Sequence, residues 1–141
     1  MTKLEEMLIR HEAMKLKPYI CPAGKVTIGV GRNIEDVGIS ESEAMFMLRN
    51  DIDRCRHEMS SKFFYFEKLS DVRQDVVLSM VFNMGLPRFL TFKKLAGALI
   101  AQDYEEAAVA MLDSKWSRQV GARASELATM MKTGSYYDKL K

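Results

Sequence analysis

The sequence predicts an α+β fold in which a small β-hairpin lobe is joined by a long helix to a larger all-helical lobe. Three observations lead to this prediction. In residues 19–33, β-branched and aromatic residues lie between turn-forming residues, as in a short antiparallel hairpin. Residues 40–62 place apolar side chains at helical spacing for about six turns. After residue 70, apolar residues recur at i, i+3 and i+4 in several segments.

A chain of 141 residues fits one domain. We expect a single domain over 1–141 with three parts. Residues 13–39 form the sheet-bearing lobe, residues 40–62 form the connecting helix, and residues 63–141 together with 1–12 form the helical lobe.

The composition is that of an ordinary globular protein, with 28% charged residues and a net charge of +2. No apolar run is long enough to span a bilayer, and the first residues lack the apolar core of a signal peptide. Two cysteines, Cys21 and Cys55, make no disulfide framework, so we expect reduced thiols. Basic residues gather late in the chain; a solvated helical surface is the favoured reading, with weak steering of an anionic polymer as the alternative.

The first helix is expected over residues 3–12, with Thr2 as its N-cap and Leu4, Met7 and Leu8 on one stripe. Pro18 prevents the helix from continuing. A hairpin then turns at residues 22–24, and a third short strand is expected over residues 32–35. So small a sheet must lean on helices.

Ser40 and Glu43 form a capping box that opens the long helix. The following helices are expected, in order, over 72–84, 92–100, 104–112 and 123–131. Ser70 caps the first of these and Gly85 ends it. Trp116 is expected to anchor the core of the helical lobe.

Glu12 stands at the end of the first expected helix. The partial negative charge of a helix C-terminus disfavours an ionised carboxylate, which suits a general acid at neutral pH. The alternative is a surface ion pair with Arg118 or Arg123, and by residue type alone that alternative is favoured.

The context changes this balance. Glu12 is followed after eight residues by Cys21, and after five more by Thr27, which leads into Ile28-Gly29-Val30-Gly31. This pattern resembles the phage-type lysozymes, endolysins that cleave bacterial peptidoglycan. In that family a glutamate is followed at these spacings by an aspartate or cysteine and then by a threonine, which leads into T-I-G-x-G.

Further blocks of the chain are similar to the same family and follow in the same order. They are Leu16-Lys17-Pro18-Tyr19, Val72-Arg73, Met80 to Gly85, Glu106-Ala107-Ala108, Ser114-Lys115-Trp116, Gly121-Ala122-Arg123 and Thr133-Gly134. The resemblance therefore covers nearly the whole chain.

The resemblance implies a lysozyme-like fold and a glycoside hydrolase (a muramidase) that cuts the β-1,4 bond between N-acetylmuramic acid and N-acetylglucosamine. Glu12 would be the acid and Thr27 would hold the attacking water. Cys21 stands at a carboxylate position, but an ordinary thiol is mostly neutral at pH 7. It is a thiol of lowered pKa, a partly ionised base or transient nucleophile, or a spectator; a catalytic role is favoured. Inversion or retention stays open.

Positions that match the family's substrate cleft are Asn83, Phe92 and Arg123. Asn83 and Arg123 would donate hydrogen bonds to sugar and peptide groups, and Phe92 would be wall or core. Arg32 stands where relatives usually carry a histidine, and we expect it to pair with Asp51 on the long helix.

No cofactor or metal is expected, since the chemistry is proton transfer plus water. His11, Cys21, Cys55 and His57 lack the paired short spacing of zinc ligands, and Gly29-Val30-Gly31 is not a dinucleotide fingerprint.

The resemblance implies peptidoglycan as the partner, no nucleic acid and no stable membrane insertion. It also implies a monomer held in the host cytoplasm until a holin gives it access to the wall. Two alternatives remain: a lytic transglycosylase, in which Glu12 acts alone and the muramic 6-hydroxyl replaces water, and a non-catalytic wall-binding module.

Overall fold

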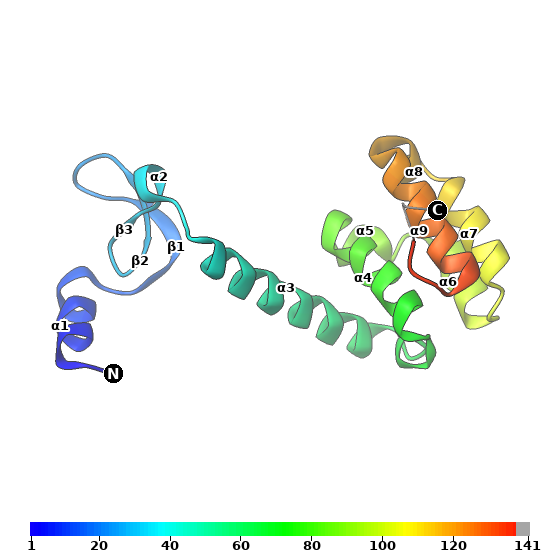
Figure 1. Ribbon diagram of the computed structural model, residues 1–141, viewed down its shortest axis with the longest axis horizontal. Coiled ribbons are helices and arrows are strands. Elements are labelled where there is room, and N and C mark those ends of the chain that lie inside the picture. Colours follow the sequence, from blue (N-terminus) through cyan, green and yellow to red (C-terminus); the bar gives the residue numbers. More distant parts are fainter. Residues whose placement is uncertain (138–141) are drawn as a thin grey trace. The chain divides into compact units, whose positions relative to one another are not determined.

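The computed structural model describes residues 1–137 and divides the chain into two compact units, Met1–Leu48 and Arg49–Lys141 (Figure 1). Helix α3 (Glu41–Lys62) contributes residues to both. Many helices and one small antiparallel sheet confirm the predicted α+β class. The long helix begins and ends where the apolar spacing predicts.

The first unit holds the sheet and two short helices. Its elements are α1 (Lys3–Glu12), β1 (Lys15–Ile20), β2 (Val26–Gly29), β3 (Arg32–Asn33) and α2 (Ile34–Val37). The strands are antiparallel in the order β1-β2-β3, with Thr27 opposite Tyr19 on one side and Asn33 on the other. The third strand is shorter than predicted because Asn33 caps α2: its Oδ1 accepts from the Asp36 N–H at 3.1 Å.

The second unit is helical. Its elements are η1 (Phe66–Lys68), α4 (Asp71–Met84), α5 (Leu86–Phe89), α6 (Lys93–Ile100), α7 (Tyr104–Leu112), α8 (Lys115–Val120) and α9 (Ala122–Thr133). The four predicted helices are confirmed within two residues at each end. The sequence analysis missed α5 and α8, which are too short to show a helical period.

The buried apolar side chains that form the core run from Cys55 to Met131. Trp116 is 1% exposed, which confirms it as a core anchor, and its indole Nε1–H donates to Asn83 Oδ1 at 3.0 Å. An aromatic side chain of this size adds much of the apolar area that stabilises the unit.

Arg73 of α4 fastens α4 to the end of α9. Its Nε donates to the Met131 carbonyl at 2.7 Å, and its guanidinium carbon lies 3.6 Å from the centroid of the Tyr104 ring. Gly134 (φ +73°) ends α9, and a Cβ there would lie 3.2 Å from the guanidinium. A glycine is therefore required both by the left-handed turn and by the close approach of Arg73.

Helix α1 belongs to the first unit. The sequence analysis assigns residues 1–12 to the helical lobe instead, and that assignment stays a prediction.

The capping box at the start of α3 is confirmed. The Glu43 N–H donates to Ser40 Oγ at 3.1 Å, and the Ser40 N–H donates to Glu43 Oε1 at 2.9 Å. Arg32 Nη1 lies 2.6 Å from the same carboxylate, so the hairpin is tied to the first turn of α3.

The predicted partner of Arg32 is therefore wrong. Asp51 pairs at 3.0 Å with Arg54 on its own helix, and Arg32 pairs with Glu43. Glu43 lies eight residues before Asp51, about 12 Å along the helix, and it stands at the turn from which the chain enters α3.

Glu43→Gln should destabilise the first unit at neutral pH. The pKa of Glu43 is lowered from its ordinary value of 4.5 to about 2. The Arg32 guanidinium is the largest cause, and the Ser40 amide is the next. A lowered carboxyl pKa contributes stability that is present above pH 4.5 and is lost as the pH falls through 2. The melting temperature of the first unit, followed by its NMR signals, should be lower in the variant at pH 7 and should converge with wild type near pH 2.

Asp51→Asn is the control. It removes a carboxylate whose partner is on the same helix, so it should leave the first unit's melting almost unchanged. If the melting temperatures of Glu43→Gln and wild type still differ by the same amount at pH 2, the charge of the carboxylate plays no part in the stability of the first unit.

Candidate active site

Glu12 is the last residue of α1, and the chain turns sharply after it. Ala13 has φ 64° and ψ 160°, a region that residues other than glycine rarely adopt. Its N–H donates to the Ile9 carbonyl at 2.8 Å, which closes the helix. The strained turn lets β1 begin at Lys15, directly beyond the acid.

The Glu12 carboxylate lies against Gly31, in the turn that joins β2 to β3. A Cβ on Gly31 would lie 2.9 Å from Glu12 Oε2 and 3.1 Å from Cδ, so the carboxylate would have to shift to make room for it. Gly31 also has φ +65°, which favours glycine. The second glycine of T-I-G-x-G therefore makes room for the acid.

Thr27, on the central strand β2, is 3% exposed. Its Oγ1 donates to the Lys25 carbonyl at 2.9 Å. Because that bond uses the only hydroxyl hydrogen, Oγ1 can interact with a further group only as an acceptor. A water molecule at this oxygen would have to donate to it.

Cys21 follows β1 and is partly exposed. Its N–H donates to the Lys25 carbonyl at 3.0 Å, and its own carbonyl accepts from the Gly24 N–H at 2.8 Å, so a tight turn closes around the thiol. The Lys25 backbone N–H lowers the pKa of the Cys21 thiol most, followed by the Thr27 hydroxyl, while burial acts weakly against them. Further backbone N–H groups, of Ala23 and of Cys21 itself, act in the same direction.

The Thr27 hydroxyl cannot donate to the Lys25 carbonyl and to the thiolate at once. The hydroxyl donates to the carbonyl at 2.9 Å. A hydrogen bond to a thiolate would be charge-assisted and stronger, so ionisation of Cys21 would favour rotation of the hydroxyl hydrogen toward sulfur. The direction in which the Thr27 hydroxyl donates is thus coupled to the charge on Cys21.

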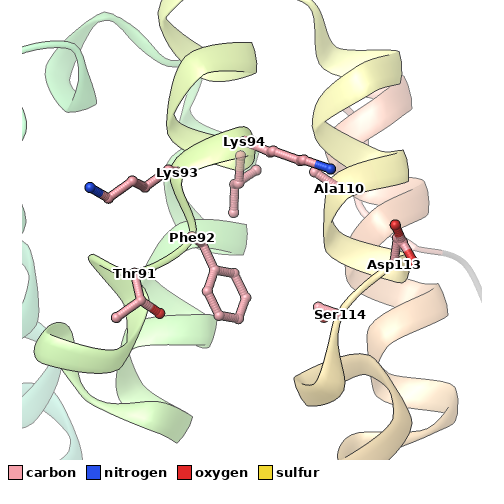
Figure 2. Close-up of a pocket in the computed structure, with 8 residues that line it drawn as sticks. Thr91, Phe92, Lys93, Lys94, Ala110, Asp113 and Ser114 are labelled. Carbon is pink, nitrogen blue, oxygen red and sulfur yellow. The ribbon is translucent and has the colours of Figure 1, made fainter.

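Phe92 lies in the second unit and lines a cavity of about 270 Å³ between α6 and α7 (Figure 2). Its ring points into that space and also stacks on Phe89 at 6.4 Å between centroids, so it is both wall and core neighbour. Lys94 reaches from α6 toward α7, and Asp113 stands on the α7 side.

Asn83 and Arg123 do not line this cavity. Asn83 Oδ1 accepts from Trp116 Nε1–H, so the amide N–H groups are the donors that this side chain keeps. Arg123 Nη2 donates to Ser79 Oγ at 3.3 Å and the residue is exposed. The roles of Asn83, Phe92 and Arg123 toward substrate stay predictions.

Across residues 1–137, no group of three or more His, Cys, Asp or Glu side chains is placed to hold a metal ion. Over the same residues, no helix is both long enough and apolar enough to cross a bilayer.

The sequence analysis missed the part played by Lys25, whose carbonyl joins Cys21 to Thr27. A lysine between two strands carries no pattern that could reveal it. The sequence could have revealed the part played by Gly31. Two glycines in a short turn predict either a positive φ or the close approach of another group to the glycine backbone.

Gly31→Ala should lower digestion of bacterial walls, the activity that the resemblance implies, by about a hundredfold, because a displaced acid no longer meets its proton acceptor. Gly29→Ala is the matched control: its φ is +72°, yet nothing lies within 4 Å of a Cβ there. Both variants carry the backbone strain, and only Gly31→Ala displaces Glu12. Equal losses of wall digestion per folded molecule would contradict the contact.

Comparison with known proteins shows the family to which this chain belongs. The phage lysozyme family matches residues 9–132. The chain is 31% identical to an endolysin of Acyrthosiphon pisum secondary endosymbiont phage 1, over 89% of this chain and 86% of that protein. It is 26% identical to a probable T4-type lysozyme of Dictyostelium discoideum, over 95% of this chain and 96% of that protein. It is 30% identical to a SAR-endolysin of Haemophilus phage HP1, over 77% of this chain and 60% of that protein. The match spans all three residues of the Glu12, Cys21 and Thr27 pattern and both units of the structure, and the chain belongs to the phage lysozyme family.

Proposed function

We propose that this protein is an endolysin that hydrolyses the β-1,4 bond between N-acetylmuramic acid and N-acetylglucosamine in peptidoglycan, for host-cell lysis. Membership of the phage lysozyme family gives it a cell-wall lytic, lysozyme-type activity. The observation that carries the finer proposal is the position of Glu12 against Gly31 of the hairpin turn, next to the strand that bears Thr27.

In the proposed reaction Glu12 gives its proton to the glycosidic oxygen as the bond from that oxygen to the anomeric carbon breaks. A water molecule that donates a hydrogen bond to Thr27 Oγ1 attacks the anomeric carbon. The Cys21 thiolate takes the proton that this water loses. A proton that passes through solvent from the thiol to Glu12 then restores both groups. If Cys21 instead attacks the anomeric carbon first, the product keeps its configuration, so the product anomer separates the two routes.

The substrate-binding roles belong to the same proposal. Phe92 would be an apolar wall for the glycan or its peptide, because it lines an open cavity. The amide of Asn83 and the guanidinium of Arg123 would donate hydrogen bonds to carbonyl and carboxylate groups.

A second candidate reaction is lytic transglycosylation, in which the muramic 6-hydroxyl replaces water. The observation that favours it is the 3% exposure of Thr27, since a hydroxyl so buried offers little surface to a water molecule. The non-catalytic wall-binding module is disfavoured, because binding alone requires neither a thiol whose pKa is lowered by amide groups nor an acid beside a turn.

We further propose that the enzyme is a monomer, needs no cofactor, and stays in the host cytoplasm until a holin opens the way to the wall. Its relatives include both an endolysin and a SAR-endolysin. The likeness alone therefore does not select one route of release.

Glu12→Gln should reduce wall digestion by about a hundredfold or more, because an amide cannot donate the proton that the leaving oxygen needs. Loss of turbidity of a cell-wall suspension measures the rate, and mass spectrometry of the fragments identifies the reaction. Hydrolysis adds one water to each cut, and transglycosylation gives an anhydro sugar one water lighter. Glu6→Gln, in the same helix, is the control, and full activity of Glu12→Gln would refute Glu12 as the acid.

Cys21→Ser should lose far more activity than Cys21→Asp, because serine has no ionised form at neutral pH. The lowered pKa of the thiol means that activity falls as the pH drops through it and the thiolate is protonated. In Cys21→Asp this acid limb should move to lower pH, toward the carboxyl range near about 4. Cys21 would be a spectator if both variants lost the same activity and if the activity of Cys21→Asp fell at the same acid pH as that of wild type.

A further inference from the structure

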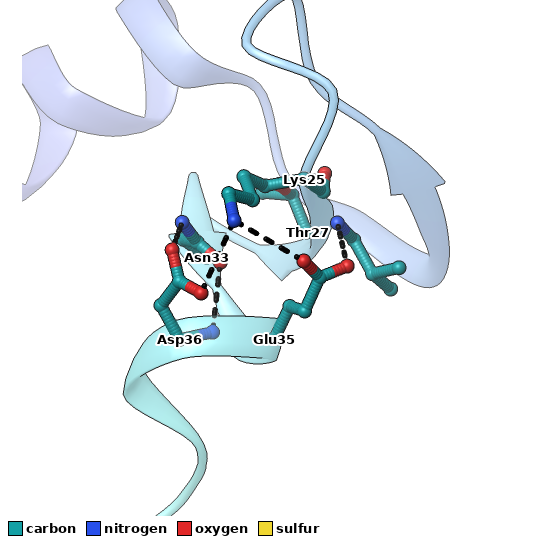
Figure 3. Close-up of polar contacts among 6 residues, drawn as sticks. Lys25, Thr27, Asn33, Glu35 and Asp36 are labelled. Carbon is teal, nitrogen blue, oxygen red and sulfur yellow. Dashed lines mark hydrogen bonds and ion pairs between the residues drawn. The ribbon is translucent and has the colours of Figure 1, made fainter.

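Lys25 stands between Cys21 and Thr27 in the chain, and its side chain reaches α2. Its Nζ lies 3.4 Å from Glu35 Oε2 and 3.4 Å from Asp36 Oδ1 (Figure 3). Both carboxylates come from the first turn of the helix. One ammonium group is therefore held by two acids on one neighbouring element.

The two carboxylates are themselves held. Asp36 Oδ2 accepts from the Asn33 side-chain amide at 2.9 Å, and the Asp36 N–H donates to Asn33 Oδ1 at 3.1 Å. Glu35 Oε1 accepts, at 3.5 Å, from the N–H of Val26, the residue after Lys25 (Figure 3). Helix α2 thus contacts both the side chain of Lys25 and the start of β2.

The backbone of Lys25 meets both candidate reacting groups. Its carbonyl accepts from Thr27 Oγ1 at 2.9 Å and from the Cys21 N–H at 3.0 Å. Its own N–H is the largest cause of the lowered pKa of the Cys21 thiol. A shift of the Lys25 backbone, whose N–H and carbonyl flank its Cα, would move the thiol and the hydroxyl together.

We propose that Lys25 is a positioning residue for Cys21 and Thr27, with Glu35 and Asp36 holding its ammonium group so that its backbone keeps its place. The assignment of a reaction role to Lys25 rests on the proposed function. The placement of the thiol does not, and it can be measured without any substrate.

The contact suits local positioning more than global stability. The side chains of Lys25, Glu35 and Asp36 are 40%, 45% and 53% exposed, and ion pairs this exposed add little to folding. Their effect is to be sought in the geometry of the turn. A purely structural anchor would change the melting temperature and leave the thiol as it is.

The first experiment titrates the Cys21 thiol by its rate of alkylation with iodoacetamide as a function of pH. It uses the full chain carrying Cys55→Ala, so that one thiol reports. The decisive variant is Glu35→Gln with Asp36→Asn. Loss of two nearby negative charges would by Coulomb's law alone lower the thiol pKa, whereas loss of the hold on Lys25 should raise it. The proposal expects the titration midpoint to rise.

Lys25→Met should raise the midpoint as well, and Lys25→Arg should restore it, because a guanidinium can still reach both carboxylates. Combining Lys25→Met with the two α2 substitutions should give little further rise in the midpoint. Either change alone already removes the same pair of ion pairs between Lys25 and α2. Lys17→Met, an exposed lysine of β1, is the matched control and should leave the midpoint unchanged. A midpoint that falls in the α2 double variant, or that does not move in Lys25→Met, overturns the proposal.

The second experiment measures wall digestion by the same set of variants. We expect kcat to fall by about tenfold in Lys25→Met with KM unchanged, because the reacting groups are misplaced and the glycan contacts are not. If wild type does not cut peptidoglycan and the thiol midpoint still rises, the proposed function fails and the positioning of the thiol stands. If wild type is active and Lys25→Met digests walls as well as Lys17→Met does, the reaction role of Lys25 is refuted.

Discussion

The geometry of the candidate site depends on polar contacts, because the sheet that carries it has almost no apolar core of its own. Within Met1–Leu48, all of which the structure describes, Thr27 is the one buried side chain. Three short strands do not form a stable sheet by themselves. Two groups of exposed ion pairs orient the strands against the neighbouring helices: Arg32 with Glu43 at the start of α3, and Lys25 with the acids of α2. Since exposed ion pairs are screened by salt, the site should respond to ionic strength more than the helical unit does.

The same constraint explains how the reacting groups are held. Backbone groups hold Cys21 and Thr27, and the lack of a side chain on Gly31 leaves space for Glu12. Backbone N–H groups do not titrate and do not change rotamer, so they can favour a thiolate in a lobe with little burial. The strained turn at Ala13 belongs to this arrangement, because it directs the chain from the acid straight into the first strand.

The second unit is organised differently. A continuous apolar core surrounds Trp116, and its indole hydrogen bond to Asn83 links that core to an exposed residue. Arg73 joins two helices that are far apart in the sequence by capping the last carbonyls of α9. Phe92, which lines the cavity between α6 and α7, packs against this core and is held by it.

The sequence by itself determined the fold class, the long helix with its capping box, and most helices of the second unit, because these follow from periodicity and capping within a few residues. It also determined the family, since the spacing of Glu12, Cys21 and Thr27 is a property of the chain. Only the tertiary structure decided the partner of Arg32, the contact of Glu12 with Gly31, and the place of Lys25 between thiol and hydroxyl. Each of these joins residues through the path of the backbone in space, which depends on turn angles and on strand pairing. Charge and spacing left several candidate partners for Arg32, among them Asp51 and Glu43 on the same helix. Only the distance between the side chains in the folded chain selects Glu43.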